Sequence, residues 1–255
     1  MSATPLRRLE TAPGRRPFPA PLAMAFQPIV DAGSRDVFAY EALVRGVDGE
    51  SAADMLSMVD LGNRHDFDQQ CRMTAFECAA RLGLKDGPAA LSINFLPNAV
   101  VDVGACTRLA KQAAENLNFA PHRIIFEFTE GERVDDPAHL GKIIAAYREA
   151  GFRAAIDDFG AGYSGLTLLA QFQPDIVKLD MELVRGIDSD RVSRSIVASI
   201  RRMCDELGIV LVAEGIETFG EYAVLRDLGV SLLQGFLFAR PQTDALPVPV
   251  WPRLR

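Results

Sequence analysis

The stretch "MAFQPIVDAGSRDVFAYEALVR", residues 24–45, contains two apolar runs separated only by the six residues "DAGSRD". Neighbouring parallel strands need a crossover connection of about a dozen residues or more. The link is too short for such a crossover. We therefore predict that residues 24–30 and 37–45 form an antiparallel pair at the start of the fold.

The rest of the chain alternates short apolar runs with helical patterns. Helical spacing is clear at Leu140, Ile143, Ile144 and Tyr147, and again at Ile196, Ile200, Met203 and Leu207. The six further strand candidates are residues 90–96, 123–130, 152–158, 175–180, 209–215 and 232–238. Eight strands with helices between most of them predict an α/β fold, a (β/α)₈ TIM-like barrel with the first strand antiparallel to the others.

Composition and charge set limits on the class of protein. The 255 residues are 49% hydrophobic, enough for one large core. Residues 1–20 are rich in Pro and Arg and predict a disordered leader, with one domain over 21–255. The net charge of −7 argues against a nucleic acid polymer as partner. No apolar run is long enough to span a membrane, and the four cysteines lack zinc spacing, which favours a cytoplasmic protein with reduced thiols.

The stretch "IDDFGAGYSGL", residues 156–166, places two aspartates side by side after an apolar run. Neighbouring side chains of a strand point to opposite faces, so Asp157 and Asp158 can serve one site only if the strand ends there. Two close carboxylates repel each other unless a positive charge lies between them. A metal ion is therefore the obvious candidate. With only three histidines in the chain, a histidine-rich metal site is not expected.

Single polar residues interrupt most of the predicted strands, each beside apolar neighbours: Glu41, Asn94, Glu127, Lys178, Glu214 and Gln234. The two-residue period turns these side chains into the barrel, near the mouth where barrel enzymes keep their sites. Each has an ordinary explanation alone; Lys178 could form a structural salt bridge, and Glu214 and Glu217 could lie on a solvated helix face. Their convergence favours a shared metal site, because buried lone carboxylates are costly.

The motifs "FQPIV", "YEALVR", "INFLP", "FEFTE", "IDDFGAGYSGL", "DIVKLD", "VAEGIET" and "QGFLFARP" follow one another between Phe26 and Pro241. In this order they resemble the EAL domain family of cyclic di-GMP phosphodiesterases. The resemblance implies hydrolysis of cyclic di-GMP to linear 5′-pGpG with two divalent cations, Mg²⁺ or Mn²⁺, and inhibition by Ca²⁺. The alternatives are a non-hydrolysing cyclic di-GMP receptor or protein-interaction module of the same fold, and a barrel enzyme acting on another phosphoester.

The resemblance also implies a role for individual residues of this sequence. The first cation would be held by Glu41, Asn94, Glu127 and Asp157, and the second by Asp157, Asp158 and Glu214. The catalytic set would be Lys178, Glu214 and Gln234, with Lys178 contacting the attacking water or the scissile phosphate. Substrate would be bound by Gln27, Leu43, Arg45, Phe238 and Pro241, the last two bordering a guanine.

The loop after "DDFG" carries the differences from the family pattern. Ala161 and Gly165 replace the usual threonine and serine, and Gly131 follows Glu130 where a polar residue is commoner. The resemblance implies that Glu130 and Glu217 steady this loop, and that relatives often dimerise near it. A homodimer is therefore one expectation. The input signal and any regulatory protein partner stay open.

Overall fold

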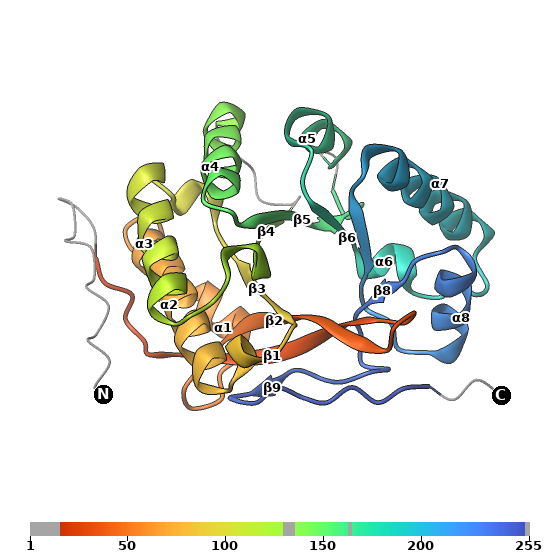
Figure 1. Cartoon of the computed structure of the whole chain (residues 1–255), viewed down its shortest axis with the longest axis horizontal. Helices are drawn as coiled ribbons and strands as arrows, with labels where there is room; N and C mark the ends of the chain where they lie inside the picture. Colours follow the sequence, from red (N-terminus) through yellow and green to blue (C-terminus); the bar gives the residue numbers. More distant parts are fainter. Residues whose placement is uncertain (1–15, 130–135, 163–164, 253–255) are drawn as a thin grey trace.

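The computed structural model describes residues 16–129, 136–162 and 165–252, and it shows a closed barrel of strands surrounded by helices (Figure 1). Strands β1 (Leu22–Asp31) and β2 (Asp36–Gly46) are antiparallel, as the short link predicts. Strand β1 also pairs antiparallel with β8, which closes the barrel. The parallel strands after β2 are β3 (Ala90–Asn94), β4 (Ile124–Thr129), β5 (Arg153–Phe159), β6 (Ile176–Leu179), β7 (Val210–Ala213) and β8 (Leu232–Leu233).

The eighth strand is much shorter than predicted. Residues 234–238 leave the sheet, and the backbone of Leu237 donates a hydrogen bond to the carbonyl of Ile216, 3.0 Å away. Gly235 makes this approach possible, because a Cβ there would lie 2.0 Å from the carbonyl oxygen of Ile216. A short strand that the sequence did not indicate, β9 (Gln242–Thr243), pairs antiparallel with β1.

The helices cover the outside of the barrel (Figure 1). Their bounds are α1 (Ala52–Ser57), α2 (Arg64–Arg81), α3 (Val103–Asn116), α4 (Pro137–Glu149), α5 (Gly165–Phe172), α6 (Met181–Val184), α7 (Arg191–Leu207) and α8 (Phe219–Asp227). Helices α4 and α7 confirm the two predicted patterns. The buried face of α7 differs from the predicted stripe, because Ile196 is 40% exposed whereas Val197 and Cys204 are fully buried.

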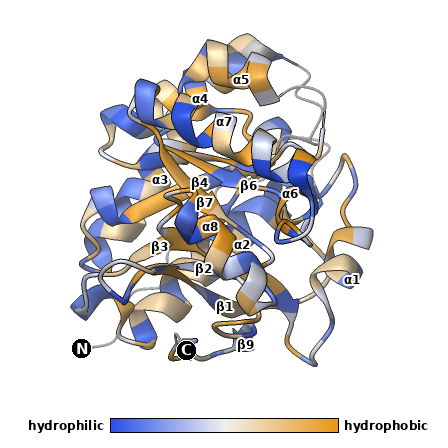
Figure 2. Ribbon diagram, turned by 90° about the vertical axis from the view of Figure 1, so that its right-hand side faces the viewer, coloured by the Kyte–Doolittle hydropathy of each residue, from blue (hydrophilic) through white to orange (hydrophobic). Residues whose placement is uncertain are grey.

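The barrel is filled by one inward-pointing apolar residue from each of its eight strands. This layer consists of Ile29, Ala39, Ala90, Ile125, Ala155, Ile176, Val212 and Leu232. A larger core lies between the strands and the helices, where Phe126, Tyr147 and Phe152 stack or meet edge to face. In Figure 2 the central strands are mainly orange, and blue segments lie on the surrounding helices. The alternation of the strands thus produces two separate apolar layers.

The predicted leader divides into two parts. Residues 1–15 lie outside the described residues. Phe18, by contrast, is 5% exposed and packs on Phe67 of α2, with 4.8 Å between the ring centroids. Its backbone N–H also donates to the carboxylate of Asp66. Residues 16–20 therefore belong with the packed domain. Across the described ranges, we find no helix that combines the length and apolar character needed to cross a bilayer.

Candidate metal centre

The site is the next inward layer above the apolar filling of the barrel. Because side chains alternate along a strand, two residues beyond each apolar filler another side chain points inward. These residues are Glu41, Ser92, Glu127, Asp157, Lys178, Glu214 and Gln234. Gln27 fills the same level from β1, two residues before Ile29, because that strand runs the other way. Strands β1 to β6 thus each contribute one polar side chain to a single layer, and Glu214 and Gln234 join it directly after the ends of β7 and β8.

Lys178 lies at the centre of this layer and is fully buried. Its ammonium nitrogen contacts four carboxylate oxygens: Glu214 Oε1 at 2.6 Å, Glu127 Oε2 at 2.8 Å, Asp157 Oδ1 at 3.1 Å and Glu41 Oε2 at 3.2 Å. One positive charge cannot balance four ionised carboxylates at this depth. The layer therefore lacks positive charge, and protons or metal cations must supply it.

The carboxylates form two groups that share one residue. Glu41, Glu127 and Asp157 offer oxygens that lie within 4.8 Å of one another, and so do Asp157, Asp158 and Glu214. The first group contains the three carboxylates of the predicted first set, and the second group contains the three residues of the predicted second set. Their role as cation ligands stays a prediction. Oxygen-rich sites of this kind suit Mg²⁺ and Mn²⁺. The donor set therefore fits two adjacent divalent cations.

The adjacent aspartates reach one site through a bulge, which corrects the predicted end of the strand. Strand β5 continues to Phe159, but its register with β6 shifts between Ile156 and Phe159. Asp158 adopts a positive φ of 53°, a conformation that aspartate tolerates better than most residues. The bulge turns the second carboxylate toward the side of the first. Gly160, with φ of 103°, continues the turn.

Neutral side chains orient the carboxylates. Asn94 donates to Glu41 Oε1 at 2.9 Å, and Gln234 donates to Glu41 Oε2 at 2.8 Å. Ser92, which sequence reasoning missed, donates to Glu127 Oε1. A serine within an apolar strand is common, so only its predicted inward position could have identified Ser92 as part of the site. The amide oxygen of Gln234 is buried without a hydrogen-bond partner among the described residues, and it is free to accept from a water or a ligand.

Burial and charge shift the pKa values of the cluster in opposite directions. Burial raises the pKa of Glu127 to about 8, and it raises the pKa of Glu214 well above its usual value. Burial also raises the pKa of Asp158, to about 6. Burial alone would lower the pKa of Lys178, but the surrounding carboxylates raise it well above the ordinary value. Lys178 is thus held as a cation, and Glu127, Asp158 and Glu214 hold protons more readily than usual. The pKa of Glu41 is lowered instead, because Lys178 and the amides of Gln234 and Asn94 outweigh its burial.

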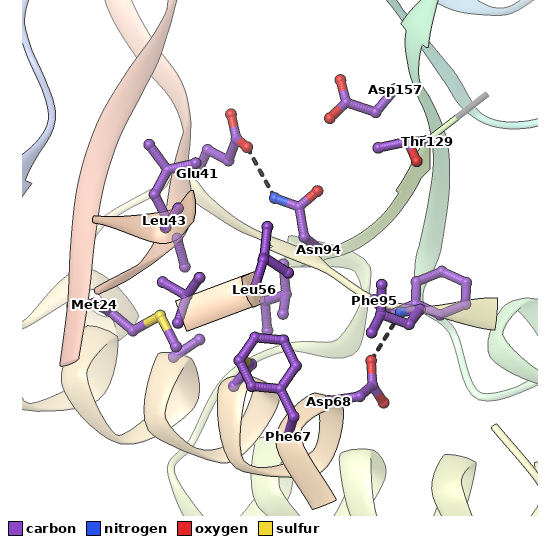
Figure 3. Close-up of a pocket in the computed structure, with 17 residues that line it drawn as sticks. Met24, Glu41, Leu43, Leu56, Phe67, Asp68, Asn94, Phe95, Thr129 and Asp157 are labelled. Atoms are coloured by element: carbon purple, nitrogen blue, oxygen red, sulfur yellow. Dashed lines mark hydrogen bonds between the residues drawn. The ribbon is translucent and has the colours of Figure 1, made fainter. Parts of the chain in front are cut away.

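Two cavities meet at the cluster. One of about 490 Å³ is lined by Gln27, Leu43, Asp158, Glu214 and Phe236, among others. The other, of about 370 Å³, is mainly apolar and runs from Glu41, Asn94 and Asp157 toward α1 and α2 (Figure 3). Glu41, Leu43 and Asp157 line both cavities. The two cavities therefore border each other at these three residues.

The other predicted substrate residues lie at different depths. Gln27 is 8% exposed and donates to the Ala239 carbonyl at 3.1 Å. Arg45 donates to the Val44 carbonyl, and Pro241 is partly exposed. Phe238 is 1% exposed and packs on Tyr222 and Trp251, so its burial argues against contact with a guanine.

Phe236 is the aromatic residue that lies at the cavity instead. Phe236 is 44% exposed, and the Arg240 guanidinium lies 4.2 Å from the centroid of its ring. It sits two residues before Phe238 in the same "QGFLF" motif, but the sequence analysis named only Phe238. Their difference in exposure follows from the turn at Gly235, which the sequence alone did not predict.

The two residues predicted to steady the loop after "DDFG" have different outcomes. Glu130 lies outside the described residues. Glu217 forms an exposed ion pair with Arg185, with 2.8 Å between Oε1 and the guanidinium nitrogen. Its role toward the loop stays a prediction.

The fold and the site together define an α/β barrel whose acidic mouth suits divalent cations. A model of the EAL domain matches residues 20–241, and the chain belongs to the EAL domain family. This confirms the predicted family and its barrel with an antiparallel first strand.

Two curated relatives illustrate the sequence similarity. The "blue light- and temperature-regulated antirepressor BluF" of Escherichia coli is 34% identical over 229 residues, which cover 89% of this chain and 56% of BluF. The "cyclic di-GMP phosphodiesterase PdeR" of E. coli is 36% identical over 151 residues, covering 59% of this chain and 23% of PdeR. The chain therefore spans little more than half of BluF and about a quarter of PdeR.

Solved structures give closer matches in length. A "standalone versatile EAL protein" from Vibrio cholerae, in a form bound to c-di-GMP, is 48% identical with a TM-score of 0.85, covering 90% of this chain and 95% of that one. Klebsiella pneumoniae BlrP1, in a complex with manganese and cyclic di-GMP, is 38% identical with a TM-score of 0.87, covering 96% of this chain and 62% of that one.

Proposed function

We propose that this protein is a metal-dependent phosphodiesterase that hydrolyses cyclic di-GMP to linear 5′-pGpG. The observation that carries the proposal is the pair of carboxylate groups sharing Asp157 beside the buried Lys178. The relative named a cyclic di-GMP phosphodiesterase and the neighbours solved with cyclic di-GMP support the substrate. The manganese in one of those neighbours supports the use of a divalent metal.

The residues divide into cation-holding and reaction-directing groups. Glu41, Asn94, Glu127 and Asp157 would hold the first Mg²⁺ or Mn²⁺, and Asp157, Asp158 and Glu214 the second. When bound, such cations lower the pKa of water and offset the negative charge of the phosphate. They also explain how a protein with a net charge of −7 can bind an anionic dinucleotide.

Three side chains of the layer would act on the reacting groups. The Lys178 ammonium supplies positive charge where negative charge develops on the phosphate. The carboxylate of Glu214 is 17% exposed at the larger cavity, so it can accept a proton from the attacking water. The partnerless amide oxygen of Gln234 can orient that water. The water oxygen then forms the new bond to phosphorus while the bond from phosphorus to the 3′-oxygen breaks. The proton that Glu214 accepted passes to the leaving 3′-oxygen, and the ring opens.

A second candidate function is a receptor or interaction module that binds cyclic di-GMP without cleaving it. The observation in its favour is that BluF, a relative that matches most of this chain, is named as an antirepressor. Retention of the carboxylates at both cation sites favours hydrolysis, because a pure receptor can lose them without penalty. Dimerisation, a cytoplasmic location and inhibition by Ca²⁺ remain part of the proposal.

The test is incubation of the purified chain with cyclic di-GMP and Mg²⁺ or Mn²⁺, with products separated by chromatography. We expect 5′-pGpG to accumulate, and EDTA to prevent it. Glu41→Ala serves as a control that removes one carboxylate. If cyclic di-GMP binds, as measured by calorimetry, but no product forms with either metal, the receptor function replaces the enzyme.

A further inference from the structure

Helix α2 buries a charged pair outside the metal layer. Asp68 is 2% exposed and Arg72 is 5% exposed, and their side chains form an ion pair one helical turn apart. Arg72 also donates to the hydroxyl of Tyr147 at 2.8 Å. The second oxygen of Asp68, Oδ1, accepts a hydrogen bond from the backbone N–H of Leu96 at 2.8 Å. The pair thus reaches from α2 to the segment that follows β3.

A gain in folding stability does not explain why this ion pair is buried. Moving both charges out of water is costly, and apolar residues of similar volume often replace a buried ion pair without loss of stability. The neighbouring buried positions of α2, such as Phe67 and Phe76, are apolar. Apolar residues could not reproduce the hydrogen bonds to Tyr147 and Leu96, and only the bond to Leu96 reaches the backbone beside the metal layer.

That hydrogen bond fixes the backbone two residues after Asn94. The sheet holds the chain as far as Phe95, whose N–H donates to the Glu127 carbonyl at 2.9 Å. The next N–H, on Leu96, has left the sheet and donates to Asp68. Further along, the His65 imidazole, also from α2, lies 2.8 Å from the Ala99 carbonyl oxygen. Helix α2 therefore holds both ends of the turn at Pro97–Ala99.

Figure 3 shows how this contact relates to the metal layer. Asp68 lies on α2 beneath the strand end, and Asn94 projects from the same backbone toward Glu41 and Asp157. The Asn94 amide donates to Glu41 at 2.9 Å and turns its oxygen toward the side of Asp157. Asn94 has a short side chain, so any displacement of its backbone moves the ligand oxygen by a similar amount.

We propose that Asp68 is a positioning residue that sets the affinity of the first cation site through Asn94. The inference rests on the proposed metal-dependent function. Outer partners that orient metal ligands change metal affinity by about 10–100-fold when removed. Misplacement by about 1 Å can cost on the order of a hundredfold in rate. Asp68 lines the smaller cavity, but the role proposed here acts through its hydrogen bond to the Leu96 backbone.

The sharpest test replaces the whole pair with apolar residues of similar volume, Asp68→Leu with Arg72→Met. This double variant leaves no unpaired buried charge and removes the hydrogen bonds to Leu96 and Tyr147. We expect its unfolding midpoint to fall only modestly, because two polar groups lose a partner, while Mn²⁺ binding at the first cation site, measured by calorimetry, weakens about 10–100-fold. The kcat for cyclic di-GMP should fall more than the KM changes.

Tyr147→Phe is the matched control, because it removes the outer partner of Arg72 and leaves the Asp68–Leu96 bond. Its Mn²⁺ affinity should stay within about twofold of the wild type. Asp68→Asn keeps an amide oxygen that can still accept from Leu96, so it should retain most of the wild-type Mn²⁺ affinity. If the double variant fails to fold, Asp68→Asn is compared with Asp68→Ala, which cannot accept this hydrogen bond.

Four results would overturn the inference. Wild-type Mn²⁺ affinity in the double variant, or equal loss in Tyr147→Phe, would mean that Asp68 only supports the core. When the fallback pair is used, equal Mn²⁺ affinity in Asp68→Asn and Asp68→Ala means the same. A wild-type protein that binds no Mn²⁺ would overturn the proposed metal site itself, and this inference with it.

Discussion

Replacing Lys178 with methionine removes the ammonium that four buried carboxylates share. Methionine preserves the length and apolar stem of lysine, so the change acts mainly on charge. Breaking a buried ion pair by removing one partner costs about 3–5 kcal/mol. For a domain of this size each kcal/mol lowers the unfolding midpoint by about 2–4 °C, so the metal-free variant should melt roughly 6–20 °C below the wild type.

Divalent cations should reverse most of this loss. A ligand that binds only the folded protein stabilises it by about 2.7 kcal/mol at a hundred times its Kd and about 4.1 kcal/mol at a thousand times. Mg²⁺ replaces the missing positive charge, so the variant should gain more from Mg²⁺ than the wild type does. We expect the difference in unfolding free energy to fall to about 1 kcal/mol or less at saturating Mg²⁺.

Urea unfolding measures the difference in unfolding free energy between the variant and the wild type, once in EDTA and once in Mg²⁺. Lys111→Met, on the exposed surface of α3, is the control. A loss that is equal in EDTA and in Mg²⁺, or smaller than about 1 kcal/mol in EDTA, would refute the role of Lys178 as counter-ion to the metal layer. Turnover should fall strongly in the same variant, because the missing ammonium would stabilise the negative charge that develops on the phosphate. Affinity for cyclic di-GMP in Ca²⁺ should be largely kept.

Further predictions address the carboxylates, the metal and one helix cap. Glu41→Ala or Asp158→Asn should abolish 5′-pGpG release, because each removes a carboxylate from one of the two groups; full activity at saturating Mg²⁺ would contradict the two-cation assignment. Ca²⁺ should bind but support little turnover, since its ligand distances of about 2.3–2.6 Å exceed the roughly 2.0–2.1 Å of Mg²⁺; comparable rates with the two metals would disprove this. Glu221 accepts three backbone N–H bonds, which outweigh burial and lower its pKa. Its stabilisation is therefore present above the ordinary pKa of about 4.3 and lost as pH falls through the lower folded value. Glu221→Gln should cost about 1.5–3 kcal/mol in urea unfolding at pH 7 and less at pH 4, and a pH-independent difference would count against it.

Several features could be read from the sequence because they depend on neighbours along the chain. The six-residue link dictates an antiparallel start, whatever the rest of the fold does. The two-residue period of each strand assigns Glu41, Glu127 and Lys178 to the inside of the barrel. Where the prediction was wrong, the cause was non-local: the eighth strand ends early because Gly235 approaches the backbone of Ile216, which no local pattern reveals.

The sequence by itself determined the barrel, the inward polar residues and the acidic character of the mouth, because alternation and connection length are local properties. Only the tertiary structure decided how these groups meet. Asp158 turns to its site through a bulge set by pairing with β6, Phe236 reaches the cavity while Phe238 enters the core, and Asp68 contacts Leu96 across 28 positions. Each of these depends on contacts between distant segments, which exist only once the barrel has closed.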